Sequence, residues 1–266
     1  MENKTVSIAH KTLHYTIAGQ GNTLTFIHGF MESSQIWEKF SESLSKEFKV
    51  ICIDLPGHGQ SDIFGDVHLI DLQARLIKMV LDAEKVYHTV LIGHSMGGYV
   101  CAAFAQQFPE NTQGLGLFHS HVAADSEQTK AFRDRTIVLL NKNKTGFISQ
   151  FIPDLFAEGN AEKFPTQIRQ LTEGAQKMDK DAIIASQLGM RDRTSYLNVL
   201  VEASHPVLFI QGKRDTKSNL QKVIAQALLP KHSEILLIDS GHMGFIEEEQ
   251  QTISFIQGFA QRAFLI

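Results

Sequence analysis

The stretch LIGHSMGGYV, residues 91–100, places a serine between two glycines in the pattern Gly-x-Ser-x-Gly. The apolar run TVLIG before the serine is typical of a buried strand, and GGYVCAAFAQQ after it is typical of a helix. We therefore expect a tight strand-turn-helix with Ser95 at the turn, in a strained backbone conformation. Gly93 and Gly97 are expected to be glycines because the strand and the helix pass close together there.

This turn would lift the serine hydroxyl above the strand ends, where the first N–H groups of the helix face developing negative charge. A hydroxyl is a poor nucleophile unless a base removes its proton and a third group orients that base. Two later strand ends supply such groups, because VLFIQGKRD ends in Asp215 and ILLIDSGH ends in His242. The sequence predicts Ser95 as nucleophile, His242 as base and Asp215 as acid.

Asp239 is a rival for the acid, because it also follows a strand and lies three residues before His242. A side chain so near in sequence would struggle to reach the far nitrogen of the imidazole ring. Asp215 is therefore preferred.

Stabilising a tetrahedral intermediate requires two backbone donors. The N–H of Met96, directly after the nucleophile, is expected to be one of them. The segment FIHGFMES, residues 26–33, follows an early strand, and Gly29 permits a close backbone approach there. The N–H of Phe30 is the second expected donor.

Strands and helices alternate along most of the chain, which is typical of an α/β protein with a doubly wound, mostly parallel sheet. KTLHYTIA, residues 11–18, predicts an early, half-exposed antiparallel strand, and the six later apolar runs predict strands buried on both faces. Residues 122–200 contain only helical patterns, so they form either a second domain or a cap over the sheet edge. The core would then comprise 1–121 and 201–266.

Aromatic residues in the insertion could pack within it or line a substrate pocket. Phe151 and Phe156 are our choice for the pocket, on one short helix that Pro153 interrupts.

Composition narrows the class of partner. The 266 residues carry a net charge of −4, so the composition does not indicate a basic surface that would bind nucleic acid or an anionic membrane. The start MENKTVSIAHKT lacks the apolar core of a signal peptide, and no window reaches the roughly 18 apolar residues of a membrane span. We expect a cytoplasmic protein that acts on a small molecule.

No dinucleotide-binding fingerprint and no residues with metal-ligand spacing occur in the sequence, so no cofactor and no metal are implied.

Five motifs together resemble the α/β-hydrolase superfamily over essentially the whole chain, and are similar to its capped, esterase-like branch. The matching segments are HGF at 28–30, DLPGHGQSD at 54–62, GHSMGG at 93–98, GKRD at 212–215 and SGH at 240–242. The resemblance implies Ser95, Asp215 and His242 as the triad, and a cap of about the size of the insertion. It also implies that Asp54 and His58 are largely structural.

The first functional hypothesis is hydrolysis of a small carboxylic ester through an acyl-enzyme. The alternative uses the same triad to cleave a carbon-carbon bond of a carboxylated substrate, which would need a cationic clamp. Candidates for that clamp are Arg133, Arg135, Arg191 and Arg193. A third hypothesis is a ligand-sensing module in which the triad binds or slowly modifies a signal molecule. A serine at position 95 argues against the dehalogenase and epoxide-hydrolase branches, which use an aspartate nucleophile.

Overall fold

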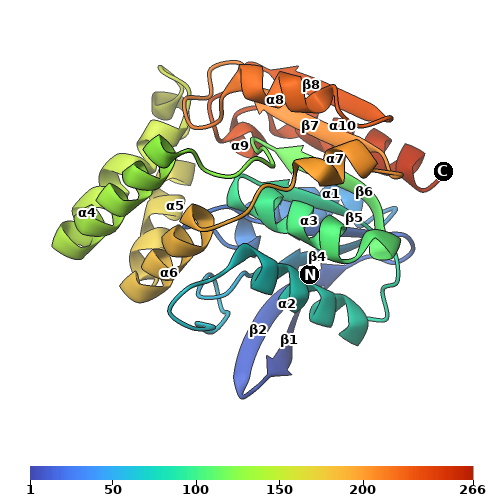
Figure 1. Ribbon diagram of the computed structural model, residues 1–266, viewed down its shortest axis with the longest axis horizontal. Coiled ribbons are helices and arrows are strands. Elements are labelled where there is room, and N and C mark those ends of the chain that lie inside the picture. The colour runs from blue at the N-terminus through green and yellow to red at the C-terminus, as the bar shows by residue number, and fades with distance from the viewer. Residues whose placement is uncertain (266) are drawn as a thin grey trace.

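A computed structural model describes residues 1–265 of the chain. Over those residues, eight strands form one sheet in the order β1-β2-β4-β3-β5-β6-β7-β8 (Figure 1). Neighbouring strands from β4 to β8 run parallel, whereas β2 is antiparallel to both β1 and β4. The doubly wound, mostly parallel α/β fold expected from the sequence is confirmed. The strands are β1 (Glu2–Ile8), β2 (Lys11–Ala18), β3 (Thr23–Ile27), β4 (Lys49–Ile53), β5 (Thr89–His94), β6 (Thr112–Phe118), β7 (Val207–Gly212) and β8 (Ser233–Ile238).

The first strand was not expected from the sequence. β1 pairs with β2 over its whole length, and the turn between them holds Ala9 and His10 at positive φ. Such turns usually carry asparagine or glycine, so the sequence lacks the hairpin signal. β1 is also mostly exposed, and its sequence contains no long apolar run that would indicate a strand.

Burial follows each strand's place in the sheet. All residues of β3, β5 and β7 are buried, as expected for strands covered on both faces. The expectation was wrong for β8, where only Ile238 is fully buried. β8 is an edge strand, so it has a neighbouring strand on one side only.

Helices cover both faces of the sheet (Figure 1). On one face α2 packs against α3, and on the other α1 packs against α10. The α-helices are α1 (Glu38–Leu44), α2 (Ile70–Ala83), α3 (Met96–Gln107), α4 (Glu127–Phe151), α5 (Pro165–Lys177), α6 (Lys180–Arg191), α7 (Leu197–Glu202), α8 (Leu220–Ala227), α9 (Gly244–Glu247) and α10 (Glu249–Ala263). The 3-10 turns are η1 (Ser34–Trp37), η2 (Pro109–Asn111), η3 (Pro153–Leu155) and η4 (Ala161–Lys163).

The insertion between β6 and β7 is helical, and α4, α5 and α6 lie together beside the sheet (Figure 1). The 25-residue α4 is interrupted at Asn143, whose backbone is extended (φ −159°, ψ 83°). Phe151 ends this long helix and Phe156 follows η3, so the expected single short helix carrying both is not formed. The division into a core and a cap at 122–200 stays a prediction.

Candidate active site

Ser95 lies at the turn between β5 and α3, with φ 49° and ψ −113°. A Cβ on Gly93 would lie 2.3 Å from the Gly97 carbonyl oxygen, and a Cβ on Gly97 would lie 2.3 Å from the Ile27 carbonyl oxygen. These separations are far below van der Waals contact, so the close approach of strand and helix requires both glycines. The tight turn expected from the sequence is present.

The three residues expected to form a triad are joined by hydrogen bonds. His242 Nε2 lies 2.9 Å from Ser95 Oγ, and His242 Nδ1 lies 2.8 Å from Asp215 Oδ2. With a neutral ring, Nδ1–H donates to the carboxylate and Nε2 accepts from the hydroxyl. Asp239 lies on the surface in an ion pair with Arg214, away from this relay.

Asp215 is held by backbone as well as by side chains. Its Oδ1 accepts the N–H groups of Lys217 and Ser218, and its Oδ2 also accepts from Gln211 Nε2. Burial raises the pKa of the Asp215 carboxyl, but the neighbouring His242 and the donated hydrogen bonds outweigh it and hold that pKa well below its usual range. The carboxylate is therefore ionised at neutral pH.

The two expected oxyanion donors flank the turn. Phe30 lies in the loop after β3, and Met96 is the first residue of α3. Among the described residues, neither backbone N–H donates a hydrogen bond. Both remain available to an oxygen at the turn, although their role in stabilising an oxyanion stays a prediction.

Sequence reasoning missed a buried ion pair behind this loop. His94 Nδ1 lies 2.9 Å from Glu32 Oε2, and His94 Nε2 lies 2.9 Å from the carbonyl oxygen of His242. Both partners accept, so both ring nitrogens carry protons. Burial lowers the pKa of His94, but Glu32 outweighs burial and raises it above its usual value. Because the carboxylate also accepts the Gly29 N–H, the pair connects the loop after β3 to the backbone of His242.

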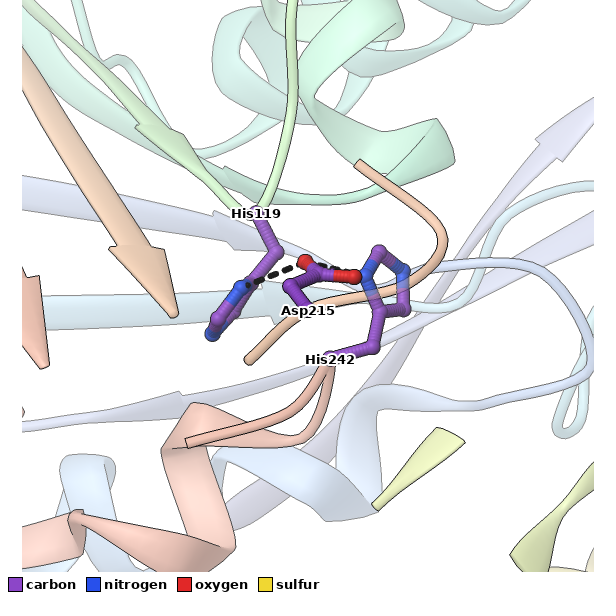
Figure 2. A group of neighbouring side chains, drawn as sticks. All are labelled: His119, Asp215 and His242. Atoms are coloured by element: carbon purple, nitrogen blue, oxygen red, sulfur yellow. Dashed lines mark hydrogen bonds and ion pairs between the residues drawn. The ribbon is translucent and has the colours of Figure 1, made fainter. Parts of the chain in front are cut away.

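Sequence reasoning also missed His119, which directly follows β6. Figure 2 shows its ring and that of His242 on either side of the Asp215 carboxylate. One ligand atom from each of the three residues lies within 4.8 Å of the others, a spacing that could hold a metal ion. Those groups already form the hydrogen bonds of the relay, and a metal on His242 Nδ1 would displace its proton. We therefore assign no metal. The available signal was His119's position at a strand end beside the strand that precedes Asp215.

The arginines considered for a carboxylate clamp are largely engaged elsewhere. Arg133 and the fully buried Arg193 both pair with Asp125, so two positive charges share one carboxylate. Arg191 forms surface ion pairs, and Arg135 is exposed. These contacts add no support for a cationic clamp at Ser95.

The two phenylalanines chosen for the pocket differ in their surroundings. Phe151 is half-buried, with its ring centroid 6.3 Å from that of Phe30 in an edge-on arrangement. Phe156 is buried against Phe164, with ring centroids 5.9 Å apart. Of the two, Phe151 therefore packs its ring beside Phe30 in the loop after β3.

Comparison with known proteins supports the expected family. A family model described as the alpha/beta hydrolase fold matches residues 22–133. The structure of a thermophilic esterase from Thermogutta terrifontis superposes with a TM-score of 0.92 at 26% identity, covering 99% of both chains. The chain has the α/β-hydrolase fold and is similar to members of that superfamily.

A methyl ester esterase and an uncharacterized protein are similar in sequence. A pimeloyl-[acyl-carrier protein] methyl ester esterase of Nitrosomonas europaea is 28% identical over 91% of this chain and 97% of its own length. An uncharacterized protein of Mycobacterium tuberculosis is 33% identical over 42% of this chain, which spans only 34% of that relative. The esterase likenesses support a hydrolase. Among residues 1–265, no helix has the length and apolar character needed to cross a membrane.

Proposed function

We propose that this α/β hydrolase is a serine hydrolase that cleaves small carboxylic esters through an acyl-enzyme. The observation that carries the proposal is the hydrogen-bonded relay from Ser95 Oγ through His242 to Asp215. The proposed substrate is a small molecule, and the cytoplasmic location expected from the sequence stays a prediction.

In the first half of the reaction, Ser95 Oγ attacks the ester carbonyl carbon while His242 Nε2 takes the hydroxyl proton. The N–H groups of Phe30 and Met96 donate to the resulting oxyanion. The tetrahedral intermediate collapses, the bond to the alcohol oxygen breaks, and His242 gives its proton to the leaving alcohol. Asp215 stays ionised throughout and stabilises the imidazolium.

In the second half, a water molecule attacks the acyl-Ser95 ester with His242 again as the base. Collapse of the second tetrahedral intermediate releases the carboxylic acid and returns the proton to Ser95 Oγ. The strained backbone at Ser95 supports both halves, because it presents the hydroxyl next to the first N–H of α3.

Replacing the nucleophile tests the proposal directly. Ser95→Ala should abolish labelling by a fluorophosphonate probe and nearly all turnover of nitrophenyl esters. The residual rate should be roughly 10³- to 10⁴-fold above that of the uncatalysed reaction in water. The matched control is Ser254→Ala, at an exposed position of α10, where the serine hydroxyl donates to the Gln250 carbonyl. Persistent labelling of Ser95→Ala would place the nucleophile elsewhere.

The same assay separates the alternatives. A wild-type enzyme that hydrolyses a panel of carboxylated vinylogous ketones and ignores the esters would favour carbon-carbon bond cleavage. A protein that is labelled at Ser95 but turns over neither panel would favour a ligand-sensing module.

A further inference from the structure

His119 is fixed at the carboxyl end of β6, between the ends of neighbouring strands. Its backbone has a φ of 48°, its N–H donates to the Ile210 carbonyl of β7, and its side chain is fully buried. A left-handed conformation is unfavourable for a residue with a side chain, so the surrounding contacts must hold it.

The contacts of the ring define where its proton lies. Nε2 lies 3.2 Å from the Gly244 N–H and accepts from it, so a neutral ring carries its proton on Nδ1. Nδ1 lies 2.9 Å from Asp215 Oδ2 and 3.3 Å from the Gly212 nitrogen. Nδ1 would donate to Asp215 but accept from Gly212, so it cannot make both hydrogen bonds. Because Asp215 is closer and charged, we assign Nδ1–H as the donor to Asp215. Burial lowers the pKa of His119 to about 4, which keeps the ring neutral near pH 7.

His119 and His242 therefore donate to the same carboxylate oxygen, from opposite sides (Figure 2). Each additional donor spreads the negative charge of Oδ2 over more hydrogen bonds. A carboxylate that is shared in this way stabilises an imidazolium at His242 less strongly than an unshared one does.

We infer that His119 is a positioning residue that holds Asp215 Oδ2 toward His242 and weakens the stabilisation that this carboxylate gives to the His242 imidazolium. This inference rests on the proposed function, because it assigns His242 as the base. It explains why a buried, neutral imidazole is retained in a left-handed conformation beside the acid.

The same site contains other groups that influence its charge. They remain unchanged in the variants below, so a comparison isolates His119. These groups are His94 on β5 with its partner Glu32, Glu247 on α9, which accepts the Gly241 N–H, and Lys217, whose N–H donates to Asp215.

The test removes the donor and follows the acid limb of the pH profile of kcat/KM. In His119→Leu, Asp215 Oδ2 loses one hydrogen-bond donor and stabilises the His242 imidazolium more strongly. The base is then protonated at higher pH, so the acid limb should move up by roughly half to one pH unit. His119→Asn should restore the wild-type limb, because its amide nitrogen occupies the position of Nδ1 and asparagine tolerates positive φ. His205→Leu is the control. His205 is also buried, but it lies before the amino end of β7, whereas Asp215 follows the carboxyl end, so the acid limb should not move.

A third variant at position 119 tests whether the effect of His119→Leu comes from misfolding at this strained position. His119→Gln keeps a polar side chain, but its amide lies where Nε2 was and cannot reach Asp215, so it should shift the limb as His119→Leu does. An unchanged limb in a folded His119→Leu or His119→Gln variant, or an equal shift in His119→Asn, would overturn the inference.

NMR titration of the His242 ring in the same variants distinguishes this inference from the proposed function. The titration needs no turnover, so it should show the upward shift even if no ester is a substrate. If wild-type and Ser95→Ala proteins hydrolyse esters equally while the titration still shifts, the function fails and the positioning by His119 stands.

Discussion

Asp215 is the residue on which most of the site's hydrogen bonds converge. Its Oδ1 accepts two backbone N–H groups and its Oδ2 accepts from His119 and His242. A carboxylate can accept from every direction, whereas an amide presents a nitrogen that donates. An uncharged isostere at this position would therefore face N–H donors with a donor of its own.

Asp215→Asn should lower kcat/KM on the order of 10⁴, because the amide selects the wrong tautomer of His242. The expected fold is intact, which the near-ultraviolet circular dichroism spectrum would check. Asp239→Asn is the matched control, since this aspartate pairs with Arg214 on the surface and should change kcat/KM little. A larger loss in Asp239→Asn would show that the acid assignment is wrong.

At the scale of elements, the junction of β5 and α3 depends on close backbone packing. Gly97→Ala would place a methyl group against the Ile27 carbonyl and should lower the free energy of unfolding by about 3 kcal/mol or more. Gly174→Ala on α5 is the control, because nothing lies within 4 Å of its added Cβ, and it should raise stability by about 0.5–1 kcal/mol. Urea denaturation of both variants measures the contrast. Equal stabilities would contradict the packing argument.

The end of α4 and the turn η3 should affect substrate choice in different ways. Phe151→Ala removes the ring beside Phe30, so it should enlarge the proposed substrate pocket and change the ratio of kcat/KM for short and longer acyl esters about tenfold. Phe156→Ala opens a cavity against Phe164 and should lower stability by about 3–5 kcal/mol, with a uniform fall across chain lengths.

A series of nitrophenyl esters, together with thermal unfolding, separates these outcomes. A chain-length shift in Phe156→Ala and none in Phe151→Ala would reverse their roles. A uniform fall in both variants would make both residues part of the packing within the insertion.

At the scale of the whole molecule, buried neutral histidines set the response to acid. Burial lowers the pKa to about 4 in the buried His68, His119 and His205, and partial burial does the same in His121. An unfolded chain protonates these side chains near pH 6.5, so between pH 6.5 and 4 the unfolded state binds more protons. The stability they contribute is complete above pH 6.5 and decreases as the pH falls through this window.

The free energy of unfolding should therefore fall below pH 6.5, by up to about 1.4 kcal/mol per pH unit for each such histidine. His205→Leu should make this decline shallower, while Lys180→Met, at the partly buried first residue of α6, should leave its slope unchanged. Denaturant titrations at pH 7, 6 and 5 measure the slope. A flat profile in the wild type would contradict the burial of neutral imidazoles.

Local pattern by itself determined the strand-turn-helix at Ser95, the helical insertion and the strand ends that carry Asp215 and His242. It did so because the period of apolar residues reports burial within one element, and because parallel strands bring their carboxyl ends to the same edge. The superfamily followed from five short motifs in order. The pairing of β1 escaped prediction, because an exposed strand with Ala9 and His10 at its turn carries no apolar or turn signal.

Only the tertiary structure decided which groups surround the relay. His119 meets Asp215 across 96 residues of sequence, and Glu32 meets His94 across 62. No local period encodes such contacts, because they depend on strand order in the sheet and on how the loops fold over its edge. The edge position of β8 has the same origin. The sequence therefore determined which residues could form the proposed relay, and the three-dimensional packing decided which further donors and charges act on it.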